Sequence, residues 1–184
     1  GGSLLSRKAE IDGLSGQTWL DQSLARLQAM GVVLLPMTTA FGLYDHGLIA
    51  LNQRRNGRPD LLWRIRPAQI VLATGAIDRP LPFAMNDLPG VMSAQAAQSY
   101  LTRFGVLVGE KIVLASNNSS TSAIAVALAE AGAQVALVDY AADAAELSAP
   151  NLRQIRGARI ETALGKRAVS GVKLSTGEEL SCDC

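Results

Sequence analysis

The hydrophobic pattern of this chain centres on a short apolar run, Ile70–Leu72, which is followed by small residues. Ile70, Val71 and Leu72 are β-branched or aliphatic, which predicts a buried strand. The small residues Thr74 and Gly75 that follow would let a ligand or another backbone come close. Ligands of α/β proteins bind outside the carboxyl ends of strands. The pattern therefore predicts a nucleotide contact at this turn, or alternatively a plain exit from a strand.

The chain before this run alternates between helical and extended patterns. Thr18 is the predicted N-cap of a helix through Met30, with apolar residues at helical spacing and Gly31 as its stop. Val32–Leu35 is predicted to be a buried strand. A small antiparallel meander is expected next, with Gly47 at positive φ in its first turn. Its parts are the extended runs 38–44, 48–51 and 61–65, with turns at Asp45–Gly47 and Gln53–Asp60.

The chain after the run has the pattern of a dinucleotide-binding unit. Prolines forbid regular structure from Arg79 to Val91, and Ser93 is the predicted cap of a helix through Phe104. A strand, a helix and a second strand that ends at Asp139 then form a βαβ unit. The two strands are predicted at 111–115 and 134–138, with the helix between them at 121–131. A third parallel strand is expected at Ala158–Thr162. A closing hairpin is expected at 168–174 and 179–184.

The loop of this βαβ unit lacks the glycines of the dinucleotide fingerprint. The three fingerprint positions are Ser116, Asn118 and Thr121, so a side chain stands where a pyrophosphate would lie. The site is either rebuilt for another ligand or retained as a scaffold without its nucleotide. The second interpretation is favoured because the glycine that lets the helix pack on the strand is missing too. Asp139 is then expected to cap a strand end.

Composition excludes several classes of function. The net charge is +1, so no strong field would attract nucleic acid, and no apolar run is long enough for a membrane span. Cys182 and Cys184 do not have metal or redox spacing and are interpreted as incidental residues of a reduced, cytoplasmic protein. His46, the one histidine, is expected to be a solvated turn residue, and a metal site is not expected.

Three blocks of sequence together resemble a known family. They are LPMTTAFGLYDH at Leu35–His46, RIRPAQIVLATGAIDRP at Arg64–Pro80, and NDLPGVM at Asn86–Met92. The chain resembles the alpha subunit of heterotetrameric sarcosine oxidases, over the middle of its nucleotide-binding region. The resemblance implies an α/β fold of the FAD/NAD(P)-binding, two-dinucleotide-domain type, with a Rossmann-like βαβ unit, a parallel sheet and a small antiparallel meander.

The resemblance also implies cofactors, partners and a site. The alpha subunits of this family carry NAD in their first dinucleotide domain, whereas FAD and FMN are associated mainly with the beta subunit. Partners would be the beta, gamma and delta subunits, and tetrahydrofolate would bind a domain absent from this chain. The matching positions give cofactor contacts at Ser3, Ala40, Thr74, Gly75 and Ala76. No catalytic residue is carried over.

The resemblance divides the chain into residues 1–92, part of the first dinucleotide domain, and residues 93–184, a degenerate second one. The expected function is that of a piece of a complex that oxidatively demethylates sarcosine to glycine with formation of hydrogen peroxide. Alternatives are the alpha-type subunit of a proline, hydroxyproline or opine dehydrogenase, and a non-catalytic scaffold with a nucleotide-binding fold. A free-standing reductase would need a redox disulfide or intact glycine fingerprint. The chain alone is expected to be inactive and to bind NAD weakly or not at all.

Overall fold

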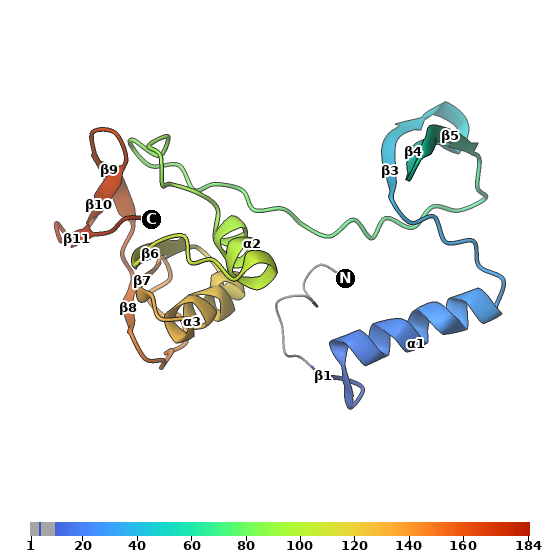
Figure 1. Ribbon diagram of the computed structural model, residues 1–184. Helices are drawn as coiled ribbons and strands as arrows, with labels where there is room; N and C mark the ends of the chain where they lie inside the picture. The colour runs from blue at the N-terminus through green and yellow to red at the C-terminus, as the bar shows by residue number, and fades with distance from the viewer. Residues whose placement is uncertain (1–3, 5–9) are drawn as a thin grey trace. The chain divides into compact units, whose positions relative to one another are not determined.

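A computed structural model of the chain describes Leu4 and residues 10–184 (Figure 1). The described residues form two compact units. Of the described residues, unit 1 contains residues 10–76, and unit 2 contains Leu4 and residues 77–184. The predicted division at 92/93 concerns two dinucleotide domains of a larger protein and stays a prediction. None of the described helices is long and apolar enough to cross a membrane.

Unit 1 opens with a two-stranded ribbon and a helix. The strands β1 (Glu10–Ile11) and β2 (Leu14–Ser15) pair antiparallel and lead into α1 (Gly16–Ala29). The N-cap is Ser15, whose hydroxyl accepts a hydrogen bond from the Thr18 backbone N–H. The prediction of Thr18 as the cap was wrong, because a serine three residues upstream already satisfies that N–H. Gly31 follows the helix at φ 74°, as a helix stop requires.

The antiparallel meander is confirmed. It consists of β3 (Thr38–Tyr44), β4 (Leu48–Arg55) and β5 (Arg58–Ile65), hydrogen-bonded in that order. The short 3-10 turn η2 (Asp45–Gly47) joins the first two strands, with Gly47 at φ 68° as predicted. His46 also has a positive φ and is exposed. The second turn is tighter than predicted, because β4 and β5 extend through most of the polar stretch 53–60.

Two predicted buried strands of unit 1 do not form. Val32–Leu35 has no strand pairing, and Val33 is 77% exposed. Ile70–Leu72 is also unpaired, with Val71 89% exposed. Both runs have strand-like sequences, but a strand needs a neighbour for its backbone groups and the described residues of unit 1 supply none. Ala50 is the one hydrophobic residue of the described part of unit 1 that is buried.

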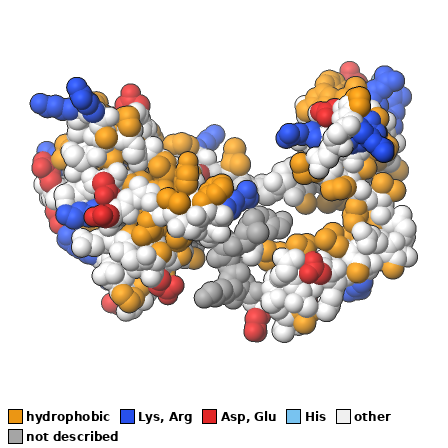
Figure 2. All heavy atoms as spheres, in the orientation of Figure 1, with side chains coloured by type: hydrophobic (Ala, Val, Ile, Leu, Met, Phe, Trp, Pro, Cys, Tyr) orange, Lys and Arg blue, Asp and Glu red, His pale blue; other side chains and the backbone are white. Residues whose placement is uncertain are grey.

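Because few side chains of unit 1 are buried, many hydrophobic ones are exposed on its surface (Figure 2). Arginine side chains gather over the β3–β5 sheet in the same view. The arginines of this sheet and its exit are Arg54, Arg55, Arg58, Arg64 and Arg66.

Unit 2 begins with an irregular segment and α2 (Ala94–Phe104). The prolines of the segment prevent regular structure as predicted, apart from one bridge between Ala84 and Thr162. Ser93 is the N-cap, with its hydroxyl 3.2 Å from the Ala96 backbone nitrogen. Gly105 ends the helix in the left-handed conformation at φ 66°. Both caps were predicted from the sequence.

The βαβ unit of unit 2 is confirmed. The strands β6 (Lys111–Ser116) and β7 (Gln134–Asp139) are parallel, and the helix α3 (Ser122–Glu130) connects them after a short 3-10 turn, η3 (Ser119–Thr121). The third parallel strand is β8 (Leu152–Arg156), paired to β7. The prediction of Ala158–Thr162 for this role was wrong. That stretch enters the antiparallel sheet instead, because Gly157, at φ 71°, turns the chain after β8.

The remaining strands form an antiparallel sheet on the other face of the parallel one. They are β9 (Ile160–Gly165), β10 (Val169–Leu174) and β11 (Glu179–Ser181), and the β10–β11 hairpin was predicted. In β6, Ile112 and Leu114 pack in a core with α2 and α3, whereas Val113 packs with the residues of β9 and β10. Strand alternation therefore gives unit 2 three layers: helices, parallel sheet, antiparallel sheet (Figure 1).

Candidate nucleotide-binding site

The loop after β6, where a dinucleotide fingerprint would lie, is filled by hydrogen bonds among its own side chains. The Thr121 hydroxyl donates to the buried Ser116 hydroxyl, which in turn donates to the Asn118 carbonyl oxygen. The Asn118 side-chain oxygen accepts from the Ser120 backbone N–H at 2.8 Å and so caps η3. A fingerprint loop instead leaves its backbone N–H groups to a phosphate.

The acidic residue at the end of β7 is also hydrogen-bonded within the protein. Asp139 is 5% exposed, and its carboxylate accepts a hydrogen bond from the Gln154 side-chain nitrogen at 2.7 Å. The same amide donates to the Ala145 carbonyl and accepts from the Leu147 backbone N–H, each at 2.9 Å. Gln154 therefore holds the loop between β7 and β8 next to the carboxylate that would bind a ribose in an active fingerprint.

These contacts do not fit a dinucleotide at the carboxyl ends of β6 and β7. Side chains occupy the second and third fingerprint positions, and the acidic residue has a protein partner. Asp139 therefore has a structural role at the end of β7, of the kind expected for a strand-end cap. No group of three or more potential metal ligands gathers in the part of the chain that the structure describes.

The turn Thr74–Ala76 offers more room. Its three residues are exposed, and Gly75 has φ 74° with no atom within 4 Å of the position that a Cβ would occupy. A ligand could therefore approach this backbone closely, which fits the predicted contact. Ala40 lies exposed in the middle of β3, paired with Leu51. No hydrogen bond in the described part of the chain joins Ala40 to the turn, and Ser3 lies outside the described residues.

The two cysteines lie on either side of an aspartate that binds the start of β6. The Asp183 carboxylate oxygens accept from the Glu110 and Lys111 backbone N–H groups, each at 3.0 Å. Burial raises the pKa of Cys182 from 9.0 to about 11, with further contributions from Cys184 and Asp183. Burial and Asp183 also raise the pKa of Cys184. Both thiols are free and stay protonated at neutral pH, which fits structural residues and not reactive ones.

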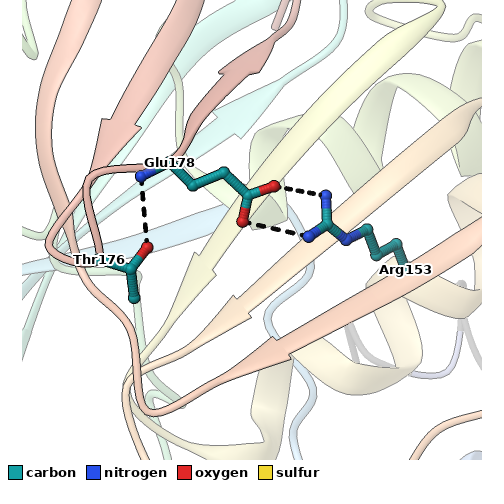
Figure 3. A network of polar contacts seen from close by, with 3 residues as sticks. All are labelled: Arg153, Thr176 and Glu178. Atoms are coloured by element: carbon teal, nitrogen blue, oxygen red, sulfur yellow. Dashed lines mark hydrogen bonds and ion pairs between the residues drawn. The ribbon is translucent and has the colours of Figure 1, made fainter.

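A groove of unit 2 lies at the amino ends of the parallel strands, between them and β11. Arg153 and Glu178 form an ion pair there at 2.8 Å, while the Glu178 backbone N–H points to the Thr176 hydroxyl (Figure 3). Both side chains are more than a third exposed, so the pair contributes little stability. The groove lies at the end of the sheet opposite to the one where nucleotides bind.

Two residues with clear roles were missed by sequence reasoning. Gln154 looks like an ordinary strand residue, and nothing in the sequence connects it with Asp139. Asp78 lies in one of the three family-like blocks, yet its carboxylate accepts from the Gln95 backbone N–H at 2.9 Å and so binds the first turn of α2. Its position 17 residues before Gln95 gives no local signal of this contact.

Curated relatives match most of this chain. It is 39% identical over 173 residues to the sarcosine oxidase alpha subunit from Corynebacterium sp. (strain P-1), which covers 85% of the chain. It is 36% identical over 188 aligned positions to the protein of the same name from Rhizobium meliloti (strain 1021), covering 96%. This chain is a homologue of the sarcosine oxidase alpha subunit. It spans only 18% and 19% of the length of these two relatives.

A third relative of this alpha-subunit homologue bears a different name. It is an opine oxidase subunit from Rhizobium meliloti (strain 1021), 33% identical over 125 residues, which covers 67% of the chain and 26% of that protein. All three relatives are named as subunits, so they belong to assemblies with further chains. No family model matches the sequence.

Solved structures confirm the predicted fold of the alpha-subunit homologue. L-proline dehydrogenase from P. horikoshii matches with a TM-score of 0.68 at 20% identity, over 100% of the chain and 33% of that protein. A ferredoxin reductase from Rhodopseudomonas palustris matches with a TM-score of 0.59 at 20% identity, over 86% of the chain and 41% of that protein. The fold is therefore the α/β fold of FAD/NAD(P)-binding oxidoreductases, and at these identities the match shows the fold alone.

Proposed function

We propose that this chain forms part of the alpha subunit of a sarcosine oxidase-type complex, which oxidatively demethylates sarcosine to glycine with formation of hydrogen peroxide. The observation that carries the proposal is 36–40% identity to three sarcosine oxidase alpha subunits. Within the complex this chain supports a nucleotide and contacts other subunits. Beta, gamma and delta subunits complete the assembly. FAD and FMN are associated mainly with the beta subunit, and a further domain binds tetrahydrofolate.

The nucleotide belongs to the turn Thr74–Ala76 and not to the loop after β6. Gly75 leaves open space where a side chain would stand, whereas the Asn118 side chain occupies the second fingerprint position of the other loop and accepts a hydrogen bond from the Ser120 backbone N–H. NAD is the nucleotide that the family resemblance implies, and Ser3 and Ala40 are its further proposed contacts. These residues form only part of a site, so the 184-residue chain alone binds NAD weakly or not at all.

Activity of the purified complex tests the function. The longest natural polypeptide that contains this chain is co-expressed with its genomic neighbours, and peroxide is measured with sarcosine, proline, hydroxyproline and an opine. Peroxide formation with sarcosine and a copurifying flavin are expected. Oxidation of an opine with no response to sarcosine would favour the second candidate, a subunit of an opine oxidase, which the 33% identity to such a protein supports.

Nucleotide content tests the site separately. Gly75→Ala is expected to lower the NAD retained by the purified complex at least about fivefold, because a methyl group would block the approach to the turn. Gly57→Ala is the matched control, since Gly57 has a similar φ of 67° and equally open surroundings in a hairpin. Asn118→Ala is expected to leave the NAD content unchanged. Loss of NAD from Asn118→Ala and not from Gly75→Ala would reverse the assignment.

Calorimetric titration checks the incompleteness of the site. The 184-residue chain titrated with NAD is expected to give no binding tighter than about 100 μM, because it spans only 18% and 19% of two alpha subunits and the proposed contacts are only part of a site. Micromolar affinity would refute the prediction of weak binding, and a crystal with a pyrophosphate against Ser116–Thr121 would refute the assignment of the nucleotide to the turn Thr74–Ala76.

A further inference from the structure

The turn between β4 and β5 contains an asparagine followed by a glycine. Asn56 and Gly57 form this turn, and the residues on either side of it, Arg55 and Arg58, face each other across the two strands. Both turn residues are exposed. Gly57 has φ 67° and no atom within 4 Å of the position that a Cβ would occupy. The turn therefore has free space in which its side chain and backbone can move.

The two strands hold this turn by few contacts. The β4–β5 ladder has an irregularity between Gln53 and Arg55, so a single pair, Arg55 with Arg58, lies between the irregularity and the turn. Pro59 in β5 has no N–H to donate to the ladder. The Arg55 side chain donates to the Pro59 carbonyl at 2.8 and 3.0 Å. A local movement of the turn therefore breaks few backbone hydrogen bonds.

The polar groups of the turn are free to react with each other. Neither the Asn56 side-chain amide nor the Gly57 backbone N–H is hydrogen-bonded to another of the described residues. The side chains of Asn52 and Asn118, in contrast, are both hydrogen-bonded. No other asparagine of the sequence is followed by glycine. Asn56 therefore differs from the other asparagines in its surroundings and in its neighbour.

We propose that Asn56 is a site of spontaneous deamidation. The Gly57 backbone nitrogen attacks the side-chain carbonyl carbon of Asn56, and the new C–N bond closes a cyclic imide. The bond from that carbon to the side-chain nitrogen breaks, and ammonia leaves with the proton of the Gly57 amide. Water then opens the imide at either carbonyl and gives aspartate or isoaspartate at position 56. This inference concerns the chemistry of the hairpin and is independent of the proposed enzymatic activity.

The residues around the turn favour this reaction. Glycine has no Cβ to hinder the approach of its nitrogen, and its backbone adopts more conformations than that of any other residue. Arg54, Arg55 and Arg58 are exposed next to the turn. Their positive charges stabilise the negative charge that develops on the attacking nitrogen as it loses its proton. The charge and the flexibility of the hairpin therefore act in the same direction.

Deamidation would change both the charge and the backbone of the hairpin. The new carboxylate adds a negative charge among the arginines that surround the turn. In isoaspartate the main chain passes through the former side-chain carbons, so the short turn gains one main-chain atom. Because loop length fixes the register of a hairpin, the pairing of Arg55 with Arg58 would be disturbed.

Timed incubation of the longest natural polypeptide that contains this chain tests the proposal. Peptide mapping with trypsin resolves the three forms, in peptides that end at Arg64 because Arg58 is followed by a proline. Asn56 is expected to be lost at least about tenfold faster than Asn86, which is exposed but followed by Asp87. The loss should accelerate as the pH rises, because the attacking nitrogen must lose its proton.

A variant and an unfolded sample complete the test. Gly57→Ala keeps the asparagine and is expected to slow its loss at least about tenfold, because a methyl group hinders the nitrogen. The same polypeptide in concentrated urea gives the rate without the hairpin. The proposal is overturned if folded Asn56 is lost no faster than Asn86. It is also overturned if Asn56 reacts in urea but not in the folded protein, or if Gly57→Ala reacts at the unchanged rate.

Discussion

At the scale of single residues, Gln154 connects two parts of unit 2, although it lies in the middle of a short strand. Its amide makes three hydrogen bonds that join the Asp139 carboxylate to the loop between β7 and β8. Gln154→Leu keeps the size of the side chain but leaves the buried carboxylate without this donor. We expect the free energy of unfolding to fall by about 1–3 kcal/mol, measured by urea denaturation.

The neighbouring residue supplies the control for Gln154. Arg153→Ala removes the exposed ion pair with Glu178 and is expected to change the free energy of unfolding by less than about 1 kcal/mol. Equal effects of the two substitutions would show that Gln154 acts only as a surface strand residue.

Cys182 gives the fold a dependence on alkaline pH. Its pKa in the folded chain is about 11, above its ordinary 9.0, because burial disfavours the thiolate. A raised pKa contributes stability that is complete below pH 9 and is lost as the pH rises through 11. We expect the free energy of unfolding to fall by roughly 2 kcal/mol over this range. Cys182→Ala should show a smaller fall when both proteins are titrated by urea denaturation, and parallel curves would contradict the prediction.

At the scale of elements, α2 shows how local signals predict structure well. Ser93 and Gly105 cap its two ends, and both positions could be identified from the sequence because capping depends on residues next to the helix. Ser93→Ala is expected to lower the free energy of unfolding by about 1 kcal/mol in thermal or chemical denaturation. Gln95→Ala, an exposed position in the same turn, should change it by less than about 0.5 kcal/mol. A Ser93→Ala variant as stable as the Gln95→Ala variant would contradict the role of the cap.

Elements that depend on distant partners were predicted less well. The strands of the βαβ unit and the meander followed from apolar periodicity and turn residues. Ile70–Leu72 has an equally good strand sequence but remains unpaired, because strand formation needs a neighbour and not only a pattern. The third parallel strand was placed too late in the chain, since Leu152–Arg156 alternates only weakly between apolar and polar residues. For the candidate site, sequence identified the filled fingerprint loop but not the Gln154 contact, which joins residues 15 positions apart.

At the scale of the whole molecule, the two units differ in how much core they contain. Nearly all the buried hydrophobic residues belong to unit 2, in two clusters on the two faces of its parallel sheet. Few buried contacts mean low local stability. We therefore expect limited trypsin digestion of the 184-residue chain to cleave unit 1 first, at Arg54, Arg55 or Arg64, at least about ten times faster than unit 2. A resistant product that begins at Ile65 is expected on mass spectrometry, because Arg66 and Arg79 are each followed by a proline that prevents cleavage.

Two further observations would bear on this expectation. Within the longer natural polypeptide the same arginines should become resistant if additional segments cover unit 1. Equal cleavage rates of both units in the 184-residue chain would contradict the difference in core.

The unpaired run Ile70–Leu72 also determines how the chain can be handled in the laboratory. Consecutive aliphatic residues with free backbone groups attract identical runs on other molecules, with Val71 almost fully open to them. Concentrated samples of the 184-residue polypeptide would then turn cloudy and bind thioflavin on storage. Val71→Lys should keep them clear, so the solubility of a single variant would show whether this exposed run causes the association.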